Sequence, residues 1–490
     1  MPNWLKQRAY LTPNRLALLF KGEQWSYQAL YNESIAMAQR LYHIGIRKGD
    51  HVAFLMENKP YTVMLIHALH FLGAVMVPLN KRLTHTEINF QINDAEARHL
   101  VYDAEHAYKA EYLKGAASKI NVQKLQEIEV PPNGSPPPYD TEIDLERSHS
   151  ILYTSGTTGK PKGVILTYGN HWWSAVGSAL NLGLSPADRW LCAVPLFHVS
   201  GLSIVIRSVI YGTSMVLHAQ FEAEAMNQSI IRDQVSIASV VSVMLANMLD
   251  QLGSAIYPES FRCMLLGGGP APLTILEACK RKHIPVYQTY GMTETASQIV
   301  TLSPEDSLAK IGSAGKPLFP AQVKIVDTYG QELPFESEGE ITVKGPNVTQ
   351  SYFKRKDATA EVMLDGWLKT GDMGYFDADG FLYVLDRRKD LIISGGENVY
   401  PAEIEDCLLK HPAVAEAGVV GVDDAQWGSV PAAFVVLHPG ERMSESDIVA
   451  HCTSYLAAYK IPKYVQFEQD IPRNASNKIV RRRLIERFKR

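Results

Sequence analysis

Residues Tyr153 to Gly163 form the stretch of the chain whose composition is best suited to chemistry. The segment YTSGTTGKPKG holds four Ser or Thr residues, three glycines and two lysines in eleven positions. Backbone N–H groups and hydroxyls in such a run can surround phosphate oxygens. We therefore predict a loop that binds the phosphates of a nucleotide.

The spacing within this loop differs from that of a Walker phosphate loop. Only two residues separate Gly156 from Gly159, and Pro161 prevents the helix that normally follows. Residues 164–167 have the composition of a strand, so we expect a hairpin that closes over a triphosphate. The alternative is an exposed Gly/Thr turn, the usual meaning of a short glycine-rich run. The ordered mixture of hydroxyls, glycines and lysines favours the nucleotide loop.

Further candidates for nucleotide contacts follow a predicted strand. Tyr290 ends the strand predicted at residues 286–290 and offers a flat face for adenine. Thr293 can donate to a phosphate, and Glu294 can hold Mg²⁺ beside it. Taken alone, Tyr290 is better explained by core packing.

Three charged residues later in the chain are also candidates for ligand contacts, although their neighbouring residues give weaker support. Asp372 lies in a predicted glycine-flanked turn, where its carboxylate could accept from both ribose hydroxyls. Arg387 could add a donor fork to the ribose or a phosphate. Lys478 lies in a polar loop just before the last predicted helix. From the residues alone, surface positions explain these side chains better.

The chain that carries these residues has the composition of an ordinary globular protein. With 490 residues and 46% hydrophobic content, it is long enough for two or more domains. The formal net charge of −4 gives no global attraction to nucleic acid or to an anionic membrane. We interpret the basic cluster at residues 481–483 as the solvated face of a final helix.

Cysteine usage and hydropathy predict a cytoplasmic protein. The five cysteines are scattered, without C-x-x-C spacing, and we expect them to pack as small hydrophobes in a reducing compartment. The first residues lack the apolar core of a secretion signal. The most apolar stretch, residues 61–79, is interrupted by His67, His70, Gly73 and Pro78. A helix and then a strand explain it better than a membrane span, so no integral membrane segment is expected.

The N-terminal part alternates predicted helices and strands, which indicates an α/β domain with mostly parallel strands. Helices are predicted at residues 27–41 after Ser26, 61–72 and 84–94, and strands at 51–56, 74–79 and 99–102. Residues 131–138 are too rich in proline for either element and are expected to form a connector. Further on, an apolar strand at residues 264–266 ends in glycines, where α/β sheets bind ligands.

Six ordered motifs together resemble the adenylate-forming superfamily of acyl-CoA synthetases, luciferases and peptide-synthetase adenylation domains. They are residues 154–163, 290–294, 370–372, 385–387, 394–398 and 474–478. The resemblance implies an α/β fold with a large N-terminal domain, residues 1–388, which includes a β-rich subdomain at about 321–388. A small mobile α+β lid, residues 389–490, would rotate about a hinge at Lys389.

The resemblance also implies the ligands and their residues. ATP, Mg²⁺ and CoA would contact Thr154, Ser155, Gly156, Thr157, Thr158, Lys162, Gly268, Gly269, Tyr290, Gly291, Met292, Thr293, Asp372, Arg387, Gly395 and Gly396. Thr154 and Glu294 would hold the metal, and the catalytic group would comprise Lys478, His198 and Glu294. Residues 394–398 are expected to open a helix with Pro401 near its first position.

The implied reaction has two halves. A carboxylate attacks the α-phosphorus of ATP and expels pyrophosphate, and CoA then displaces AMP from the acyl-adenylate. Lys478 would supply electrostatic stabilisation in the first half, worth ~3 to 4 kcal/mol. In the rotated pose, Gly395 and Gly396 would let backbone lie close to a pantetheine arm.

Arg207 gives the sharpest clue to the acid. It follows the apolar run 201–206, and a buried arginine needs an anion, which could be an internal Asp or Glu or a carboxylate of the substrate. The segments 195–203, 266–272 and 297–302 resemble superfamily members that activate an aromatic dicarboxylic acid. The resemblance implies that Arg207, with Ser200 nearby, holds the second carboxylate, while His198 and Gly268 line the pocket.

Two alternatives stay open at this point. The chain could be another aryl- or acyl-CoA synthetase, or an adenylation protein that loads a carrier. It could also be a nucleotide-binding scaffold without activity, although such a scaffold would normally lack Lys478, Glu294 or Asp372, which are all present. The sequence leaves open whether the chain forms a homo-oligomer.

Overall fold

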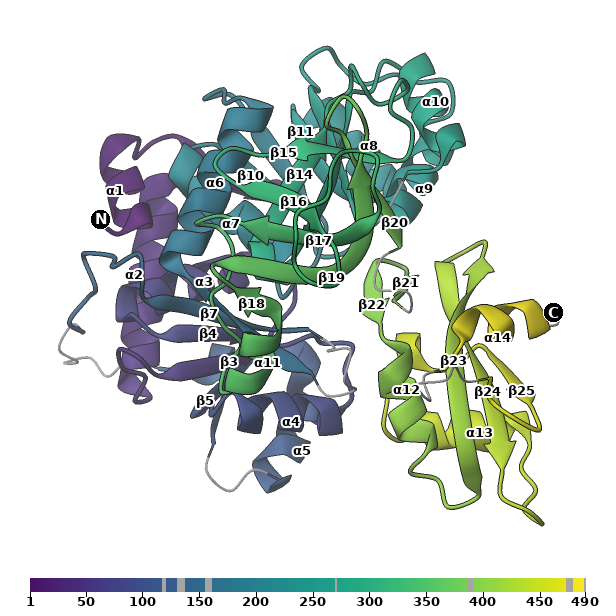
Figure 1. Cartoon of the computed structure of the whole chain (residues 1–490). Helices are drawn as coiled ribbons and strands as arrows, with labels where there is room; N and C mark the ends of the chain where they lie inside the picture. Colours follow the sequence, from purple (N-terminus) through teal and green to yellow (C-terminus); the bar gives the residue numbers. More distant parts are fainter. Residues whose placement is uncertain are drawn as a thin grey trace. The chain divides into compact units, whose positions relative to one another are not determined.

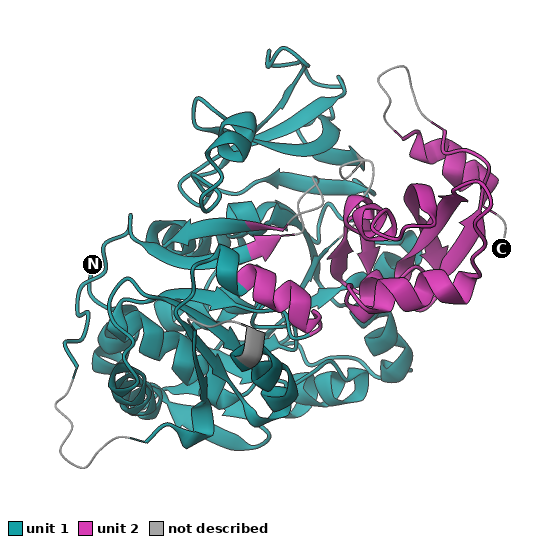
Figure 2. Cartoon of the chain, turned by 90° about the horizontal axis from the view of Figure 1, so that it is seen from below, with its two compact units in different colours: residues 1–81, 92–152, 163–385 teal, residues 82–91, 153–162, 386–490 magenta. Residues whose placement is uncertain are grey.

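The computed structural model describes residues 1–116, 120–129, 137–154, 161–268, 271–386, 391–472 and 479–488. The chain divides into two compact units, shown in Figure 2. Unit 1 comprises residues 1–81, 92–152 and 163–385, and unit 2 comprises residues 82–91, 153–162 and 386–490. The predicted boundary and hinge at Lys389 lie outside the described residues and remain a prediction.

The first sheet is built from alternating strands and helices, as the sequence predicts (Figure 1). Its strand order is β6-β5-β3-β4-β7-β8. The strands are β3 (His51–Leu55), β4 (Val75–Pro78), β5 (His99–Tyr102), β6 (Asn121–Lys124), β7 (Ser148–Thr154) and β8 (Lys162–Thr167). The pairs β3–β4, β3–β5, β4–β7 and β5–β6 are parallel, so the carboxyl ends of these strands meet along one edge.

Local signals fix the helices around this sheet. They are α1 (Trp4–Leu11), α2 (Tyr27–His43), α3 (Pro60–Leu72), α4 (His85–Asp94) and α5 (Ala107–Ala116). Ser26 caps α2 by accepting from the Ala29 N–H. Pro60 begins α3, and Gly73 ends it in the left-handed conformation. Because all α3 side chains from Thr62 to Leu72 are buried, its apolar composition reflects a core helix.

The second sheet has 14 strands, ordered β16-β17-β19-β20-β15-β14-β13-β12-β11-β9-β10-β1-β2, with β18 beside β19. Its parallel half contains β1 (Leu16–Phe20), β9 (Arg189–Cys192), β10 (Ser214–Leu217), β11 (Ile237–Val241), β12 (Cys263–Gly267) and β13 (Val286–Met292). The other strands are β2 (Glu23–Ser26), β14 (Ser297–Leu302), β15 (Ser313–Pro317), β16 (Gln322–Val326), β17 (Gly339–Lys344), β18 (Met363–Leu364), β19 (Trp367–Phe376) and β20 (Leu382–Asp386). Pairing from β13 to β14 onwards is antiparallel, so the β-rich stretch continues the parallel sheet.

Helices lead into this sheet and link its strands. They are α6 (Tyr168–Leu182), α7 (Val199–Tyr211), α8 (Ala223–Arg232), α9 (Ser242–Leu252), α10 (Leu273–Arg281) and α11 (Lys356–Val362). Short 3₁₀ turns cover Ala104–His106, Leu125–Glu127 and Thr293–Thr295. One apolar core extends through both sheets and includes Trp4, Phe54, Trp190 and Leu266.

The C-terminal part of unit 2 has two apolar clusters, one around Ile404 and Val419 and the other around Phe434. Its strands are β21 (Ile392–Ser394), β22 (Glu397–Val399), β23 (Val414–Asp424), β24 (Gly428–Leu437) and β25 (Tyr464–Phe467). Its helices are α12 (Pro401–Leu408), α13 (Glu445–Thr453) and α14 (Arg481–Arg487), with a 3₁₀ turn at Ala458–Lys460.

The segment 394–398 is a β-hairpin and does not open the helix directly. Ser394 pairs with Glu397, and the two turn residues have positive φ, 57° at Gly395 and 86° at Gly396. This is the two-residue turn that glycine pairs favour, and α12 begins only at Pro401, its first residue.

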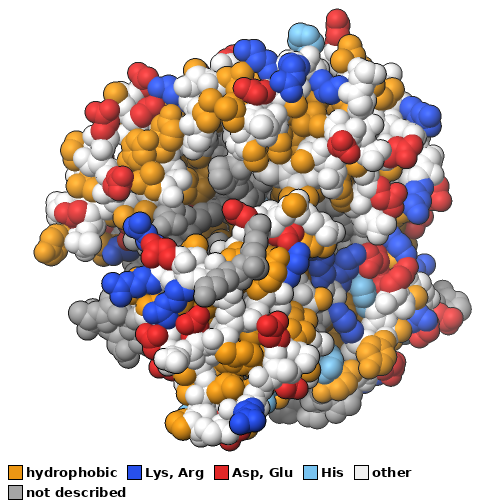
Figure 3. Space-filling model, turned by 90° about the vertical axis from the view of Figure 1, so that its right-hand side faces the viewer, with side chains coloured by type: hydrophobic (Ala, Val, Ile, Leu, Met, Phe, Trp, Pro, Cys, Tyr) orange, Lys and Arg blue, Asp and Glu red, His pale blue; other side chains and the backbone are white. Residues whose placement is uncertain are grey.

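The cysteines are buried, as the composition predicts, and the charges on one face are mixed. Basic and acidic side chains are interspersed on the face shown in Figure 3. All five cysteines are free and buried. Within the described ranges, no helix has both the length and the apolar character needed to cross a membrane.

Candidate functional site

Several predicted site residues of unit 1 lie at or just after the carboxyl ends of β9, β12 and β13, where a parallel sheet presents loops to a ligand. His198 lies in the loop between β9 and α7. Gly268 follows β12 with φ of 89°. Gly291 and Met292 end β13, and Thr293 and Glu294 form the turn after it.

Two predicted nucleotide residues, Tyr290 and Asp372, are in direct contact. The Tyr290 hydroxyl donates a hydrogen bond of 2.7 Å to Oδ2 of Asp372, and both side chains are buried. Asp372 does not lie in a turn as predicted. It lies within β19, beside Gly371 with φ of 76°, where the pairing with β17 shifts register. This bulge changes the direction of a side chain on the strand, as bulges beside active sites often do.

Glu294, the predicted metal ligand, is oriented by a tyrosine that sequence reasoning missed. Its side chain is buried, and Oε1 accepts a 2.9 Å hydrogen bond from the Tyr352 hydroxyl. The Glu294 carbonyl accepts from the Thr349 N–H at 2.7 Å. Because Tyr352 is 58 residues away in sequence, no local pattern could have revealed this pair.

A single oriented carboxylate fits Mg²⁺, which usually takes one or two carboxylates together with waters and phosphate oxygens. The described residues contain no group of three or more His, Cys, Asp or Glu side chains that could hold a metal by themselves. The second predicted ligand, Thr154, ends β7 and belongs to unit 2. The donor set is therefore suited to a metal that arrives with a nucleotide.

The loop before α7 is tightly packed against the first turn of that helix. His198 is the N-cap residue of α7, and its ring contacts Phe197 with centroids 4.6 Å apart. A Cβ at Gly201 would lie 2.2 Å from the carbonyl oxygen of Pro195. Glycine is therefore required there, and the position of the loop fixes the position of the helix.

Arg207 is buried inside unit 1, with only 2% of its surface exposed. Its Nη2 donates to Ser174 Oγ at 2.9 Å, and the guanidinium lies 5.8 Å from the centre of the Trp190 ring. Its Nε has no hydrogen-bond partner among the described residues, and none of their carboxylates forms an ion pair with it. Burial lowers the pKa of Arg207.

The internal Asp or Glu partner considered for Arg207 is therefore absent from the described part of the chain. Ser174 and Trp190 were not foreseen, because they come from α6 and β9. Ser200, in contrast, is exposed near the start of α7. It precedes Arg207 by seven residues, about 10 Å along a helix axis, so the structure does not group it with the guanidinium.

Four buried histidines, of which His171 faces Arg207, form a second unforeseen cluster. They are His67 and His70 on α3, His149 on β7 and His171 on α6. His70 and His149 contact through their Nε2 atoms, and the His149 and His171 rings lie 4.3 Å apart. Burial lowers the pKa of His67 and His171 to about 3 and of the other two well below the usual value. The cluster is neutral at pH 7.

Several predicted residues lie elsewhere. Outside the described residues are Ser155, Gly156, Thr157, Thr158, Gly269, Arg387, Lys389 and Lys478. Thr154, Lys162, Gly395 and Gly396 belong to unit 2. A Cβ at Gly395 would lie 2.7 Å from the Trp427 ring, and the Gly395 N–H donates to the Trp427 carbonyl at 2.9 Å.

The fold and these residues define an adenylate-forming enzyme, and comparison with known families agrees. A family model described as AMP-binding enzyme matches residues 5–353. A model of the AMP-binding enzyme C-terminal domain matches residues 403–478. The chain belongs to the family of AMP-binding enzymes.

Individual relatives narrow the class further. The chain is 54% identical over 484 residues to 2-succinylbenzoate–CoA ligase of Geobacillus kaustophilus, covering 99% of this chain and 97% of the relative. It is similar to o-succinylbenzoate CoA synthetase (MenE) from Bacillus subtilis, solved as a double mutant with the product analogue OSB-NCoA. That structure has a TM-score of 0.94 and 48% identity, covering 99% of this chain and 98% of the other.

The same Bacillus subtilis enzyme has been solved with other ligands. One structure contains the acyl-adenylate intermediate OSB-AMP, with a TM-score of 0.77, 48% identity, and coverage of 100% of this chain and 99% of the other. Another contains ATP and a magnesium ion, with a TM-score of 0.77, 48% identity, and coverage of 99% of each chain.

Proposed function

We propose that this chain is an AMP-forming acid–thiol ligase that converts 2-succinylbenzoate, ATP and CoA to 2-succinylbenzoyl-CoA, AMP and pyrophosphate in menaquinone biosynthesis. Full-length similarity to 2-succinylbenzoate–CoA ligases supports the reaction. The observation in the structure that carries the proposal is Arg207, a buried cation whose described surroundings supply no carboxylate. Since 2-succinylbenzoate has two carboxylates, one can be activated while the other approaches the guanidinium.

In the first half-reaction, a substrate carboxylate attacks the α-phosphorus of ATP. The carboxylate is already ionised at pH 7, so His198 lines the pocket and is not needed as a base. Asp372 would accept from the ribose hydroxyls, and the Tyr290 ring would stack on adenine, while its hydroxyl holds Asp372 in place. Glu294, held by Tyr352, would bind Mg²⁺ together with Thr154. When bound, the metal would neutralise charge on the phosphates.

The roles of the remaining candidate residues are proposed from the sequence motifs that contain them. Residues 154–158, with Lys162, would surround the phosphates, and Arg387 would add a donor fork. Lys478 would bridge the carboxylate and the α-phosphoryl group as negative charge redistributes.

In the second half-reaction, the thiolate of CoA displaces AMP. The turn at Gly395 and Gly396 would then lie beside the pantetheine arm, after rotation about Lys389. We also place the reaction in the cytoplasm, since five buried free cysteines suit a reducing compartment.

Pyrophosphate exchange with a panel of acids tests the function. The purified chain should exchange labelled pyrophosphate into ATP with 2-succinylbenzoate far better than with benzoate or medium-chain fatty acids, and CoA should then release AMP. Preference for fatty acids or monocarboxylic aryl acids would replace the substrate assignment with another acyl-CoA synthetase. Nucleotide binding without exchange for any acid would indicate a scaffold.

A further inference from the structure

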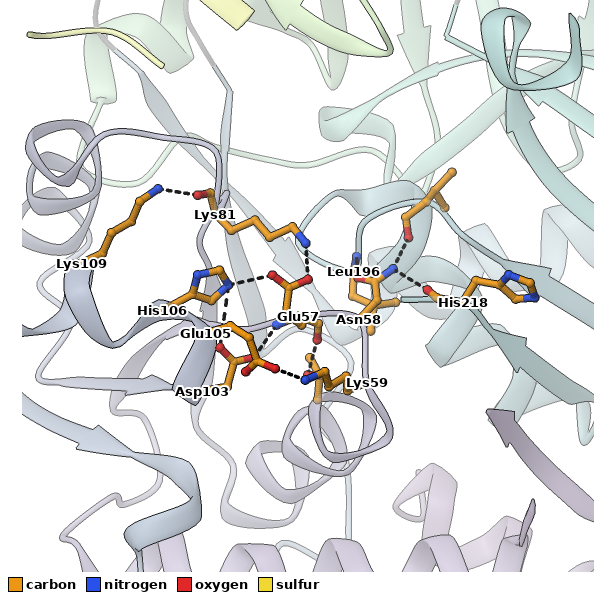
Figure 4. Close-up of polar contacts among 12 residues, drawn as sticks. Glu57, Asn58, Lys59, Lys81, Asp103, Glu105, His106, Lys109, Leu196 and His218 are labelled. Carbon is orange, nitrogen blue, oxygen red and sulfur yellow. Dashed lines mark hydrogen bonds and ion pairs between the residues drawn. The ribbon is translucent and has the colours of Figure 1, made fainter. Parts of the chain in front are cut away.

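Asn58 connects the two sheets of unit 1 through its side-chain amide (Figure 4). It follows β3 of the first sheet, and only 6% of its surface is exposed. Its Nδ2 donates to the carbonyl of Val194 at 2.9 Å and more weakly to that of His218 at 3.4 Å. Its Oδ1 accepts from the Leu196 N–H at 3.0 Å. Both ends of the amide therefore bond to loops that follow β9 and β10.

We propose that Asn58 is a positioning residue for the acid-binding loop, residues 194–198. This inference rests on the proposed function, because it assumes that His198 lines the acid pocket. Two of the three hydrogen bonds of the amide hold the backbone at Val194 and Leu196, directly before Phe197 and His198.

The position of this loop is transmitted to α7. Gly201 packs against the Pro195 carbonyl without room for a Cβ, and the His198 N–H donates to the same carbonyl at 3.2 Å. A shift of the loop would therefore move His198 and the first turn of α7 together. Tyr290 and Asp372 lie on β13 and β19, whereas the bonds of Asn58 reach the loops after β9 and β10, so the effect should fall on the acid.

A charged cluster holds Asn58 itself in place. The Glu57 cluster, shown in Figure 4, consists of Glu57, Lys81, Asp103 and His106, which follow the carboxyl ends of β3, β4 and β5. The Glu57 carboxylate pairs with Lys81 and lies 3.2 Å from His106 Nε2. The contact with His106, followed by the contact with Lys81, lowers the pKa of Glu57 to about 2.

Hydrogen bonds of the Glu57 backbone also fix the chain just before Asn58. The Glu57 N–H donates to Asp103 Oδ2 at 2.7 Å, and the Glu57 carbonyl accepts from Thr62 Oγ at 2.6 Å. These backbone bonds fix the direction of the Asn58 amide before substrate binds. Little conformational entropy is therefore lost when the amide bonds to the loop. A buried asparagine that served only its own element would not need to reach the loops after two strands of another sheet.

The test compares Asn58→Ala and Asn58→Asp with Asn227→Ala. Asn227 is a matched control, because it is also buried, donates to the Met248 carbonyl at 2.9 Å and accepts from the Tyr257 hydroxyl at 2.6 Å, away from the loop. Asn58→Asp keeps the size and the acceptor but removes both donors. KM for the acid and for ATP, kcat and the melting temperature would be measured for each variant.

Asn58→Asp, which loses both donated bonds, and Asn58→Ala, which loses all three, should each raise KM for the acid by about tenfold or more, with KM for ATP within about twofold of wild type. Hydrogen exchange should speed up at residues 194–198. Asn227→Ala should lower the melting temperature without changing the ratio of the two KM values. Equal changes in both KM values, or slow exchange at residues 194–198 in folded Asn58→Asp, would overturn the proposal.

The outcome is distinguishable from failure of the proposed function. If wild type preferred another acid in the exchange panel, the substrate assignment would fail, and the ratio of KM values would be measured with that acid. If Asn58→Ala did not fold, Asn58→Asp would decide.

Discussion

The hydroxyl of Tyr290 and the carboxylate of Asp372 share a buried hydrogen bond of 2.7 Å, although 82 residues separate them in the chain. The bond joins β13 of the parallel half of the sheet to β19 of the antiparallel half. It places an aromatic face and an acceptor-only carboxylate side by side, which suits adenine and ribose.

Tyr290→Phe should therefore raise KM for ATP on the order of tenfold, because it leaves the buried Asp372 carboxylate without this donor while keeping the ring. Steady-state kinetics with the acid saturating measures the effect. KM for the acid serves as the internal control. An unchanged KM for ATP would mean that the bond does not orient Asp372 for the nucleotide.

Tyr352→Phe should weaken the dependence of ATP binding on Mg²⁺, since the phenol no longer orients Glu294. Calorimetric titration with ATP, with and without Mg²⁺, measures this directly. We expect the increase in ATP affinity that Mg²⁺ produces to become several-fold smaller. Tyr257→Phe removes another buried hydroxyl, the one bonded to Asn227, and should leave this increase intact. If both variants behaved alike, Tyr352 would have only a structural role.

Arg207→Leu should raise KM for the dicarboxylic acid far more than KM for ATP, because the second carboxylate loses its positive partner. Arg207→Lys keeps the charge but not the planar donor fork, so we expect an intermediate KM for the dicarboxylic acid. Benzoate-type acids without a second carboxylate provide the control and should be almost insensitive to the change. Equal KM values for wild type and Arg207→Leu would place the second carboxylate elsewhere.

Lys478→Ala should slow formation of the adenylate by ~10²-fold or more and leave thiolysis of a supplied acyl-adenylate largely intact. Single-turnover measurements of each half-reaction separate the two effects. Loss of both halves to the same extent would contradict a role confined to the first.

The buried histidines predict a loss of stability in mild acid. Their folded pKa values lie below the unfolded value near 6.5, so the unfolded state binds more protons as pH falls through 6.5 towards 3. Each such histidine lowers the free energy of unfolding by up to about 1.4 kcal/mol per pH unit in that window. Urea unfolding at pH 8.0, 7.0, 6.5 and 5.5 measures the slope above pH 7 and below pH 6.5.

His67→Leu should make that slope shallower. Neither ring nitrogen of His67 has a hydrogen-bond partner within the described chain, so the substitution removes a titrating group without breaking such a bond. The slope above pH 7 should not change. A slope below pH 6.5 equal to that of wild type would show that His67 does not titrate on unfolding.

The sequence predicts what local signals determine. The cap at Ser26, the proline that begins α3 and the left-handed Gly73 each act within a few residues, so the order of helices and strands follows from them. The candidate nucleotide residues were chosen because strand ends and glycine turns mark ligand-binding edges, and their roles stay predictions.

The remaining features depend on contacts between distant segments. The bulge that places Asp372 inside β19 arises from pairing with β17, and the pair of Glu294 and Tyr352 joins two loops. Arg207 gave a signal because a charge within an apolar run is conspicuous. Its partner Ser174 gave no such signal, because serines are common on helices. Only the packing of α6 against α7 brings Ser174 and Arg207 together.

The contact between Gly201 and the Pro195 carbonyl also limits how the acid preference could be re-engineered. Any larger residue at position 201 would force apart the backbone of Pro195 and the first turn of α7. Libraries for new acids should leave that position unchanged and vary His198 and Ser200, which are half-buried and exposed, respectively.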